Sequence, residues 1–439
     1  MYWIGTYLHA SKTMKSILFS TYYFLKLIFF SKKYDVVFVS SAFFNRGEGG
    51  ENLLLKPMIE YCKHNNLKYM IFEDTDLKGV YKNFSRNQDS IPFDFISLIQ
   101  ILLRKIFYYK SKKSITKDEI YFRELKIAKI LSSVFFKKFQ SKIYITLLWN
   151  NVTLWRSISP SACVVDYQHG IIFNGHEESV KNGNPPRVKF TNEIVTFVYG
   201  ETFKHILINN DETGFYNERT VKTIGINKDT FHPKKIPLNN KKILFTLQIV
   251  PDFKDKEVNK IYIKIVESLI RSNSSFLSEN NYEIIFRHHP RFNVDNSPNI
   301  NINYDFVSFD DKTPLVDLLE MVSIHITFHS TTTIEAAMMG IPTIFIDMHE
   351  QFSPNDIFLK QYKYPFDHFV IRANEDLKFF LIELGDINKF NEKCIDIHKW
   401  SKKLYQDFDE LLFRDFLLEK MNDEKNSGDR GAIKLKKQV

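Results

Sequence analysis

The segment "HITFHSTTTIEAAMMGIPTIFID", residues 325–347, decides the fold class. An apolar strand over 324–329 ends in a hydroxyl-rich turn, a short helical run with two alanines follows, and a second apolar strand covers 342–347. Gly340 and Pro342 are typical helix stop signals. A strand, a helix and another strand in this order form the βαβ unit of a parallel sheet whose two faces are covered by helices.

The same alternation continues along most of the chain. Predicted strands of a first series cover 34–41, 67–74, 142–149, 162–170, 194–200 and 221–227, and those of a second cover 242–248, 282–290, 301–309, 324–329 and 342–347. A polar segment with two prolines, 227–242, separates the series and reads as a linker. The sequence therefore predicts an α/β protein of two doubly wound Rossmann-like domains, 1–235 and 236–400, facing a cleft. A helical end and a disordered basic tail are expected over 401–439.

The net charge and the cysteine spacing limit which partners and which cellular compartment suit the protein. The 439 residues carry a net charge of +8, which suits phosphorylated substrates or an anionic membrane. No nucleic-acid-binding motif accompanies this charge, so we expect no nucleic-acid partner. Cys62, Cys163 and Cys394 lie far apart, without disulfide or metal spacing, which favours a reducing, cytoplasmic location.

Two segments have patterns that are compatible with contact with a membrane. "SILFSTYYFLKLIFF", residues 16–30, is apolar but shorter than the roughly 20 residues that span a bilayer. It predicts a buried helix, with a helix lying on the membrane surface as the alternative. Residues 92–141 are mostly helical by pattern and join an apolar face to basic residues such as Arg104 and Lys105. That pattern is typical of a solvated helix, and contact with anionic lipid on the inner face of the plasma membrane is the alternative.

Polar side chains gather where two predicted strands of the second series end. After one strand come His329, Ser330, Thr331, Thr332 and, in the first turn of the next helix, Glu335. Hydroxyl groups and free N–H groups at such a helix start bind phosphate, although an ordinary capped helix has a similar pattern.

The second cluster is "IIFRHHPRF", residues 284–292, which supplies Arg287, His289, Pro290 and Arg291. Two arginines and a histidine at one strand end can hold a diphosphate, and a solvated basic turn is the alternative. The spacing between the two clusters suits neighbouring strands, so we expect both to reach one ligand.

"RHHP" followed by "HSTTTIEAAMMGIP" resembles the donor-nucleotide half of GT-B glycosyltransferases. The closest resemblance is to bacterial sialyltransferases, with their His-Pro and Ser-Ser/Thr motifs, and to teichoic-acid-type polyol-phosphate polymerases. The resemblance in motifs covers roughly residues 242–350. The N-terminal half resembles these enzymes in its predicted architecture alone. The resemblance implies that His289 and Pro290 contact donor phosphate or nucleotide, that Ser330 to Thr332 hold phosphate, and that Glu335 binds ribose.

The N-terminal half offers candidates for catalysis and acceptor binding. "YQHG", residues 167–170, is similar to the His-Gly motif of the polymerases, with Gln168 where tryptophan is common. The resemblance implies that His169 is the catalytic base, a role that suits the pKa of histidine. The alternative is a histidine hydrogen-bonded at a strand end.

Two further segments are assigned to the acceptor. "FEDTDLKG", residues 72–79, places Glu73 and Asp74 where sialyltransferases carry an acidic pair, with Thr75 in place of the following glycine. In GT-B enzymes the loop equivalent to "NRGEGGEN", residues 45–52, faces the acceptor, which implies a role for Glu48, Gly49 and Gly50. A flexible turn is the alternative for this loop.

These features together predict a glycosyltransferase of bacterial capsule, lipooligosaccharide or other surface polysaccharide synthesis. It would move a sugar from a nucleotide-sugar donor, bound by the second domain, to a glycan or lipid-linked acceptor on the first. Thr327 stands where many retaining enzymes carry a second glutamate, which favours an inverting reaction. The chain has no Asp-x-Asp motif, so we expect no metal and no cofactor besides the cosubstrate. A polyol-phosphate or sugar-phosphate transferase, a sugar epimerase and a non-catalytic glycan-binding protein remain alternatives.

Overall fold

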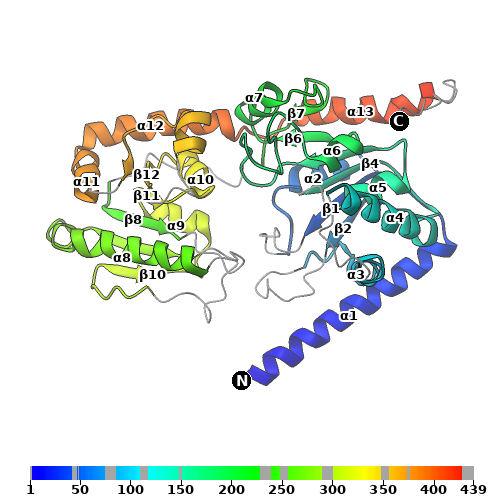
Figure 1. Cartoon of the computed structure of the whole chain (residues 1–439), viewed down its shortest axis with the longest axis horizontal. Helices are drawn as coiled ribbons and strands as arrows, with labels where there is room; N and C mark the ends of the chain where they lie inside the picture. The colour runs from blue at the N-terminus through cyan, green and yellow to red at the C-terminus, as the bar shows by residue number, and fades with distance from the viewer. Residues whose placement is uncertain are drawn as a thin grey trace.

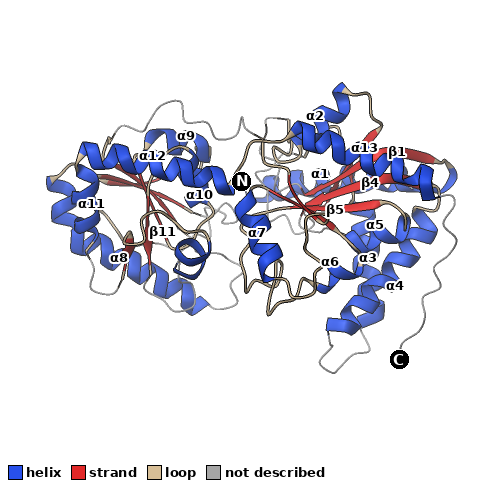
Figure 2. Cartoon of the chain, turned by 90° about the horizontal axis from the view of Figure 1, so that it is seen from above, coloured by secondary structure: helices blue, strands red, loops and turns tan. Residues whose placement is uncertain are grey.

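The protein contains two parallel β-sheets, each sandwiched between helices (Figures 1 and 2). The computed structural model describes residues 2–41, 47, 49–74, 86–108, 117–147, 151–227, 239–247, 256–288, 300–347, 355–372 and 376–427. This arrangement confirms the predicted α/β fold of two doubly wound domains.

The N-terminal sheet has seven strands in the order β3-β2-β1-β4-β5-β6-β7, all parallel. Its strands are β1 (Lys32–Ser41), β2 (Tyr69–Asp74), β3 (Ile91–Pro92), β4 (Phe139–Leu147), β5 (Cys163–Tyr167), β6 (Val195–Val198) and β7 (Val221–Thr223). Residues 36–39 of β1 are continuously apolar and buried, as expected for a strand covered on both faces. The strand order changes direction between β1 and β4, and this is where ligands bind in such sheets.

Helices cover both faces of this sheet. They are α1 (Tyr2–Phe29), α2 (Lys56–His64), α3 (Asp94–Tyr108), α4 (Lys117–Phe135), α5 (Val152–Ile158), α6 (Arg187–Thr191) and α7 (Glu201–Asn210). One face of α1 is anchored by Phe24, whose ring stacks on Phe72 of β2 with centroids 5.8 Å apart. Phe72 also stacks on Trp155 of α5, so an aromatic core joins these elements. The apolar segment 16–30 therefore buries one face only, so the expectation of a buried helix holds for that face and not for exposed side chains such as Leu18 and Phe29.

The C-terminal sheet has six parallel strands in the order β10-β9-β8-β11-β12-β13. They are β8 (Lys242–Thr246), β9 (Glu283–Arg287), β10 (Val307–Phe309), β11 (Ile324–Thr327), β12 (Thr343–Ile346) and β13 (Val370–Ile371). The helices of this half are α8 (Lys256–Glu279), α9 (Leu315–Met321), α10 (Thr332–Met338), the π-helix η5 (Asn355–Gln361), α11 (Leu377–Gly385) and α12 (Ile387–Leu404), and the last helix of the chain, α13 (Glu410–Ser427), belongs to the N-terminal half. Here the strand order changes direction between β8 and β11.

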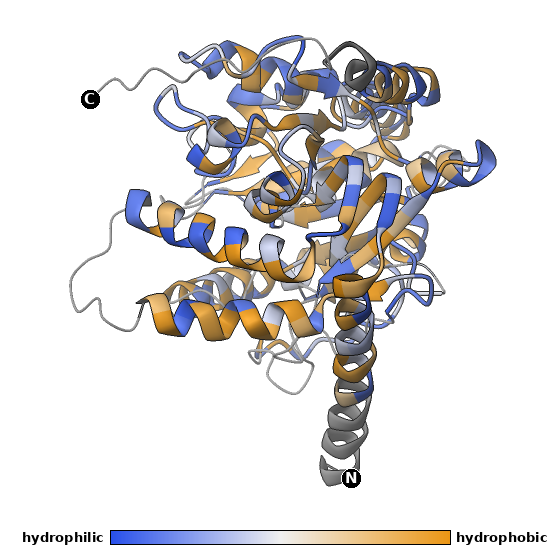
Figure 3. Cartoon of the chain, turned by 90° about the vertical axis from the view of Figure 1, so that its right-hand side faces the viewer, coloured by the Kyte–Doolittle hydropathy of each residue, from blue (hydrophilic) through white to orange (hydrophobic). Residues whose placement is uncertain are grey.

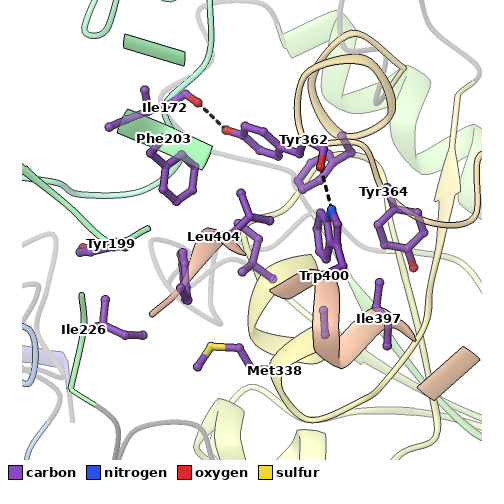
Figure 4. Close-up of a cluster of buried hydrophobic side chains, with 14 of the residues drawn as sticks. Ile172, Tyr199, Phe203, Ile226, Met338, Tyr362, Tyr364, Ile397, Trp400 and Leu404 are labelled. Atoms are coloured by element: carbon purple, nitrogen blue, oxygen red, sulfur yellow. Dashed lines mark hydrogen bonds between the residues drawn. The ribbon is translucent and has the colours of Figure 1, made fainter. Parts of the chain in front are cut away.

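A buried apolar cluster joins the two halves (Figure 4). The Tyr362 hydroxyl, after η5, donates a hydrogen bond of 2.7 Å to the Ile172 carbonyl in the N-terminal half. The Trp400 indole of α12 donates one of 2.7 Å to the Tyr362 carbonyl. Through these bonds the tyrosine hydroxyl and the indole N–H both have hydrogen-bond partners inside the cluster, as buried polar groups require.

The end of the chain returns to the N-terminal sheet. Beyond α12, the Gln406 N–H donates to the Tyr199 carbonyl, with N and O 2.8 Å apart. The approach is so close that a Cβ on Gly200 would lie 2.2 Å from the Leu404 carbonyl oxygen, so only glycine fits there. Phe413 of α13 then packs edge-on against Phe197 of β6.

Candidate functional site

The His169 loop begins at the carboxyl end of β5. The Gln168 side chain fixes it from both sides, because its amide donates 2.7 Å to the Gly170 carbonyl and its oxygen accepts 2.8 Å from the Tyr199 N–H. Gly170 has φ +74°, a left-handed conformation that favours glycine. His169 is thus half-buried on a short turn whose two flanks are held by hydrogen bonds.

The same loop runs into the junction between the two halves. Three residues after His169, the Ile172 carbonyl accepts the hydrogen bond from Tyr362. The Asn174 N–H donates to the Gln361 side chain, with N and O 2.7 Å apart. The structure therefore places His169 at the carboxyl edge of the N-terminal sheet, next to a segment of the C-terminal half.

The hydroxyl cluster lies after β11, beside the position where the C-terminal strand order changes direction. The Ser330 hydroxyl accepts from the Thr332 N–H at 3.2 Å and donates to the Thr332 hydroxyl at 3.0 Å, so serine ties the turn before α10, while the N-cap residue Thr331 makes no side-chain capping bond. Ser330 and Thr331 are half-buried, as is Glu335 in the first turn of α10. Within the described part of the chain, the buried Thr333 hydroxyl meets no hydrogen-bond partner.

The histidine of this cluster is uncharged at neutral pH. Burial lowers the pKa of His329 from 6.5 to about 4. A group buried in this way favours its neutral form because the charged form loses its hydration. His329 can therefore offer a ligand a hydrogen bond but no positive charge.

The second cluster lies after β9, and the expectation that it neighbours the first in the sheet is wrong. Strand β8 lies between β9 and β11, so two strand spacings separate the clusters. The Arg287 guanidinium donates 2.6 Å to the Thr313 carbonyl and so helps to hold the loop that follows β10. His289, Pro290 and Arg291 lie outside the described residues.

A histidine–carboxylate pair at this strand end was not predicted from the sequence. The His288 ring nitrogen Nδ1 lies 2.9 Å from Asp311 Oδ2, and the His288 N–H donates to Asp311 Oδ1 at 2.7 Å. The His288 ring also stacks on Phe309 with a centroid distance of 5.6 Å. Burial opposes ionisation of Asp311, but the bonds from His288 and the nearby Arg287 charge outweigh it and lower the pKa of the carboxyl. The doubled histidine in "RHHP" was the available signal, but its partner lies 23 residues away along the chain.

The assignment of Glu73 to acceptor binding disagrees with its surroundings. Glu73 at the end of β2 is fully buried and forms an ion pair with Arg86 at 3.2 Å. It also accepts from the Ser90 hydroxyl and the Asn87 N–H. A carboxylate enclosed in this way is a structural group with no surface left for a ligand. Asp74, the next residue, accepts 3.2 Å from Ser97 and is half-buried.

The glycine loop after β1 is described in part. Gly50 is buried with φ +75°, and its N–H donates 3.0 Å to the Gly47 carbonyl. Gly49 is exposed at the tip of this turn. Asn52 then holds the turn that precedes α2, because its side-chain oxygen accepts from the Leu54 and Leu55 N–H groups while its amide donates to Ser40 of β1. The loop is thus tied to β1, and Glu48 lies outside the described residues.

A cavity of about 450 Å³ lies in the N-terminal half between α3, α4, α5 and α6. It reaches Asn151, just after β4, which accepts 2.8 Å from the Gln100 amide. Its wall includes Arg104, which is paired with Glu124 at 2.8 Å. No three His, Cys, Asp or Glu side chains gather to hold a metal ion among the residues that the structure describes.

Comparisons with known proteins identify the fold. No family model and no curated protein matches the sequence. Among solved structures, a variant of the wall teichoic acid polymerase TagF is similar with a TM-score of 0.51 and 12% identity, over 91% of each chain. The glycosyltransferase SnogD from Streptomyces nogalater gives 0.46 and 12%, over 86% of this chain and 96% of that one. A putative UDP-N-acetylglucosamine 2-epimerase from Listeria monocytogenes gives 0.46 and 11%, over 91% and 98%. The likeness to the polymerase, together with two parallel sheets that each reverse their strand order, shows that the chain has the GT-B fold.

Proposed function

We propose that the protein is a glycosyltransferase that builds a bacterial surface glycan such as capsule or lipooligosaccharide. It moves a sugar from a nucleotide-sugar donor to a glycan or lipid-linked acceptor, with inversion and without a metal ion. One observation carries the proposal: in a GT-B fold, a histidine loop at the carboxyl edge of one sheet is hydrogen-bonded to the half that carries a hydroxyl cluster at its own switch point.

The donor is assigned to the C-terminal half. Ser330 and Thr331 hold its phosphates by hydroxyl hydrogen bonds, and neutral His329 adds a hydrogen bond without charge. Glu335, one turn further along α10, binds the ribose. The position beside the β8–β11 switch point supports this assignment, because ligands of doubly wound sheets bind there.

The reaction is assigned to His169. Its imidazole takes the proton from an acceptor hydroxyl while that oxygen attacks the anomeric carbon of the donor sugar. A new carbon–oxygen bond forms, and the bond from the anomeric carbon to the phosphate oxygen breaks. The nucleotide leaves with the electron pair, and the donor-side hydrogen bonds stabilise its charge. The Gln168 bonds on both flanks of His169 hold the base in place for this step.

A second candidate is the transfer of a polyol phosphate or sugar phosphate. The solved structure with a TM-score of 0.51 is a wall teichoic acid polymerase, and the sequence shares a His-Gly pair with that class. In this reaction the acceptor oxygen attacks phosphorus, and a nucleoside monophosphate leaves. A non-catalytic glycan-binding protein is the third candidate and would show no turnover.

A ligand screen followed by product analysis tests the proposal. Thermal shifts are measured with CMP, UDP, GDP and CDP, then with their sugars and with CDP-linked polyols. The donor that stabilises the protein is incubated with glycan and lipid-linked acceptors, and the product is examined by mass spectrometry and ³¹P NMR. A glycosidic product without a new phosphodiester supports the main proposal, and a phosphodiester supports the second candidate. Stabilisation without any product across the acceptors would contradict both transferase proposals.

A further inference from the structure

The N-terminal helix exposes an apolar stripe along one side. Leu18, Tyr22, Leu25 and Phe29 are 62%, 63%, 45% and 70% exposed and follow each other at helical spacing. Phe24, on the opposite side, is fully buried in the aromatic core. Figure 3 shows hydrophobic residues along the described part of this helix, which leads to the N-terminus. One face of α1 is therefore fixed to the protein while an equally apolar face is turned away from it.

The neighbouring helix α3 continues the apolar surface. The two helices are joined where the Phe95 N–H donates 3.1 Å to the Ser20 hydroxyl. The inner side of α3 is buried through Ile96, yet its outer side is apolar as well. The exposed large side chains of α3 are Leu98, Ile101, Leu102 and Ile106. Besides the exposed Arg104 and Lys105, the outward side of α3 thus carries a row of large apolar side chains, as expected for a helix surface that a further layer covers.

This surface, formed by the exposed apolar residues of α1 and α3, is here named the α1–α3 face. Soluble monomers seldom expose a contiguous apolar patch of more than a few hundred square ångströms. Here two helices joined by a hydrogen bond together expose at least eight large apolar side chains, four or more on each helix. The α1–α3 face therefore needs an occupant that is itself apolar.

Charges around the face indicate which occupant fits. Helix α1 contains no acidic residue, and the one acidic residue of α3, Asp94, is buried and paired with Arg86. Lys15 and Lys105 are basic and exposed on these helices. Arg104 is paired with Glu124, so it adds no net charge. The exposed charges of these two helices are therefore net positive, which complements an anionic surface.

Lys26 shows how a charge can border the apolar stripe. Its ammonium lies over the rings of Tyr22 and Phe30, 5.9 and 5.8 Å from their centroids. A lysine stem that runs along apolar side chains with its amine at their edge is the arrangement of interfacial helices. None of the described helices is long and apolar enough to cross a bilayer.

We propose that the α1–α3 face docks the protein onto an anionic lipid surface. The apolar side chains enter the boundary between head groups and acyl chains, and the lysines lie among the head groups. Since Phe24 holds the other side of α1 in the protein core, the helix lies along the surface with one face only in lipid.

Flotation with vesicles tests this proposal on the full chain. The wild-type protein is expected to float with phosphatidylcholine vesicles that contain phosphatidylglycerol, and less with phosphatidylcholine alone. The variant Leu18→Glu/Tyr22→Glu/Leu102→Glu places three charges in the apolar layer. Its partitioning into the mixed vesicles is expected to fall at least about tenfold.

A matched control comes from α11. Phe379 and Ile382 are 66% and 58% exposed there, away from the α1–α3 face. The variant Phe379→Glu/Ile382→Glu is expected to float like the wild type. Circular dichroism and thermal melting verify that all variants are folded. If the triple variant is not folded, Leu102→Glu alone is measured, with a smaller loss expected.

Three results would overturn the proposal. The first is that the wild type does not float with either kind of vesicle. The second is that the α11 variant loses as much partitioning as the variant of the α1–α3 face. In the third, light scattering on a sizing column finds a wild-type dimer that the face variant dissociates, while neither protein floats. That result would make the face a contact between two copies of the chain.

Discussion

The buried histidine of β11 gives a sharp prediction about pH. His325 is fully buried, with Nε2 2.8 Å from the Thr246 hydroxyl and Nδ1 2.9 Å from the Thr343 hydroxyl. Burial lowers its pKa from 6.5 to about 3. In the unfolded chain the same ring takes up a proton as the pH falls below 6.5, so the unfolded state binds more protons. Stability is therefore lost as the pH falls from about 6.5 toward 3.

The magnitude follows from this difference in proton binding. At pH 5 the folded ring of His325 is still neutral while the unfolded ring is mostly charged, which costs about 2 kcal/mol of folding free energy relative to pH 7.5. Because pH 5 lies well above the pKa of His325 in the folded protein, the expected loss of folding free energy depends mainly on the pKa of the unfolded chain. His325→Gln removes the titrating group and retains an amide that can bond to the two hydroxyls.

The assay is urea unfolding at pH 7.5 and pH 5, followed by tryptophan fluorescence, for the wild type, His325→Gln and the exposed-histidine control His64→Gln. Each variant is compared with itself at the two pH values, so an overall loss of stability does not affect the result. The pH-dependent loss is expected to be about 2 kcal/mol smaller in His325→Gln than in the other two. An equal loss in all three proteins would show that His325 does not cause the pH dependence.

Two further predictions concern the candidate site. Glu73→Gln removes one of the two buried carboxylates that pair with Arg86, the other being Asp94, and is expected to lower the unfolding free energy by about 2 kcal/mol, with the acceptor KM unchanged. A raised KM at wild-type stability would return Glu73 to acceptor binding. Ser330→Ala/Thr331→Ala is expected to weaken nucleotide binding at least about tenfold in calorimetry, since two hydroxyl hydrogen bonds are lost. Unchanged affinity would place the donor phosphates elsewhere.

Much of the fold could be predicted because parallel strands have a strong local signal. The run 36–39 is apolar at every position, and a strand buried on both faces requires this. Strands β3 and β13 were missed because each has two residues, too few for a pattern. The return of α13 to the first sheet was also missed, since its apolar positions do not say which sheet they pack against.

For the candidate site, the sequence predicted where its residues lie in the sheets better than it predicted which residues they contact. His169 and Ser330 follow strand ends, where ligands of doubly wound sheets bind, and strand ends can be read from sequence. The partners of Glu73 and His288 could not be read from sequence, because the tertiary fold brings Arg86 and Asp311 to them. The sheet order that inserts β8 between β9 and β11 is likewise a property of the whole domain.

The catalytic role of His169 is tested most directly by comparing two histidines of one loop. His169→Ala and His176→Ala each remove an imidazole, and the His176 ring packs on Phe173 with the ring centroids 4.8 Å apart. With the donor and acceptor found by the screen, kcat is measured for both, and the donor Kd is measured by calorimetry. His169→Ala is expected to lower kcat by about 10²-fold or more with the donor Kd unchanged, while His176→Ala turns over like the wild type. Near-normal turnover of His169→Ala would contradict the catalytic role.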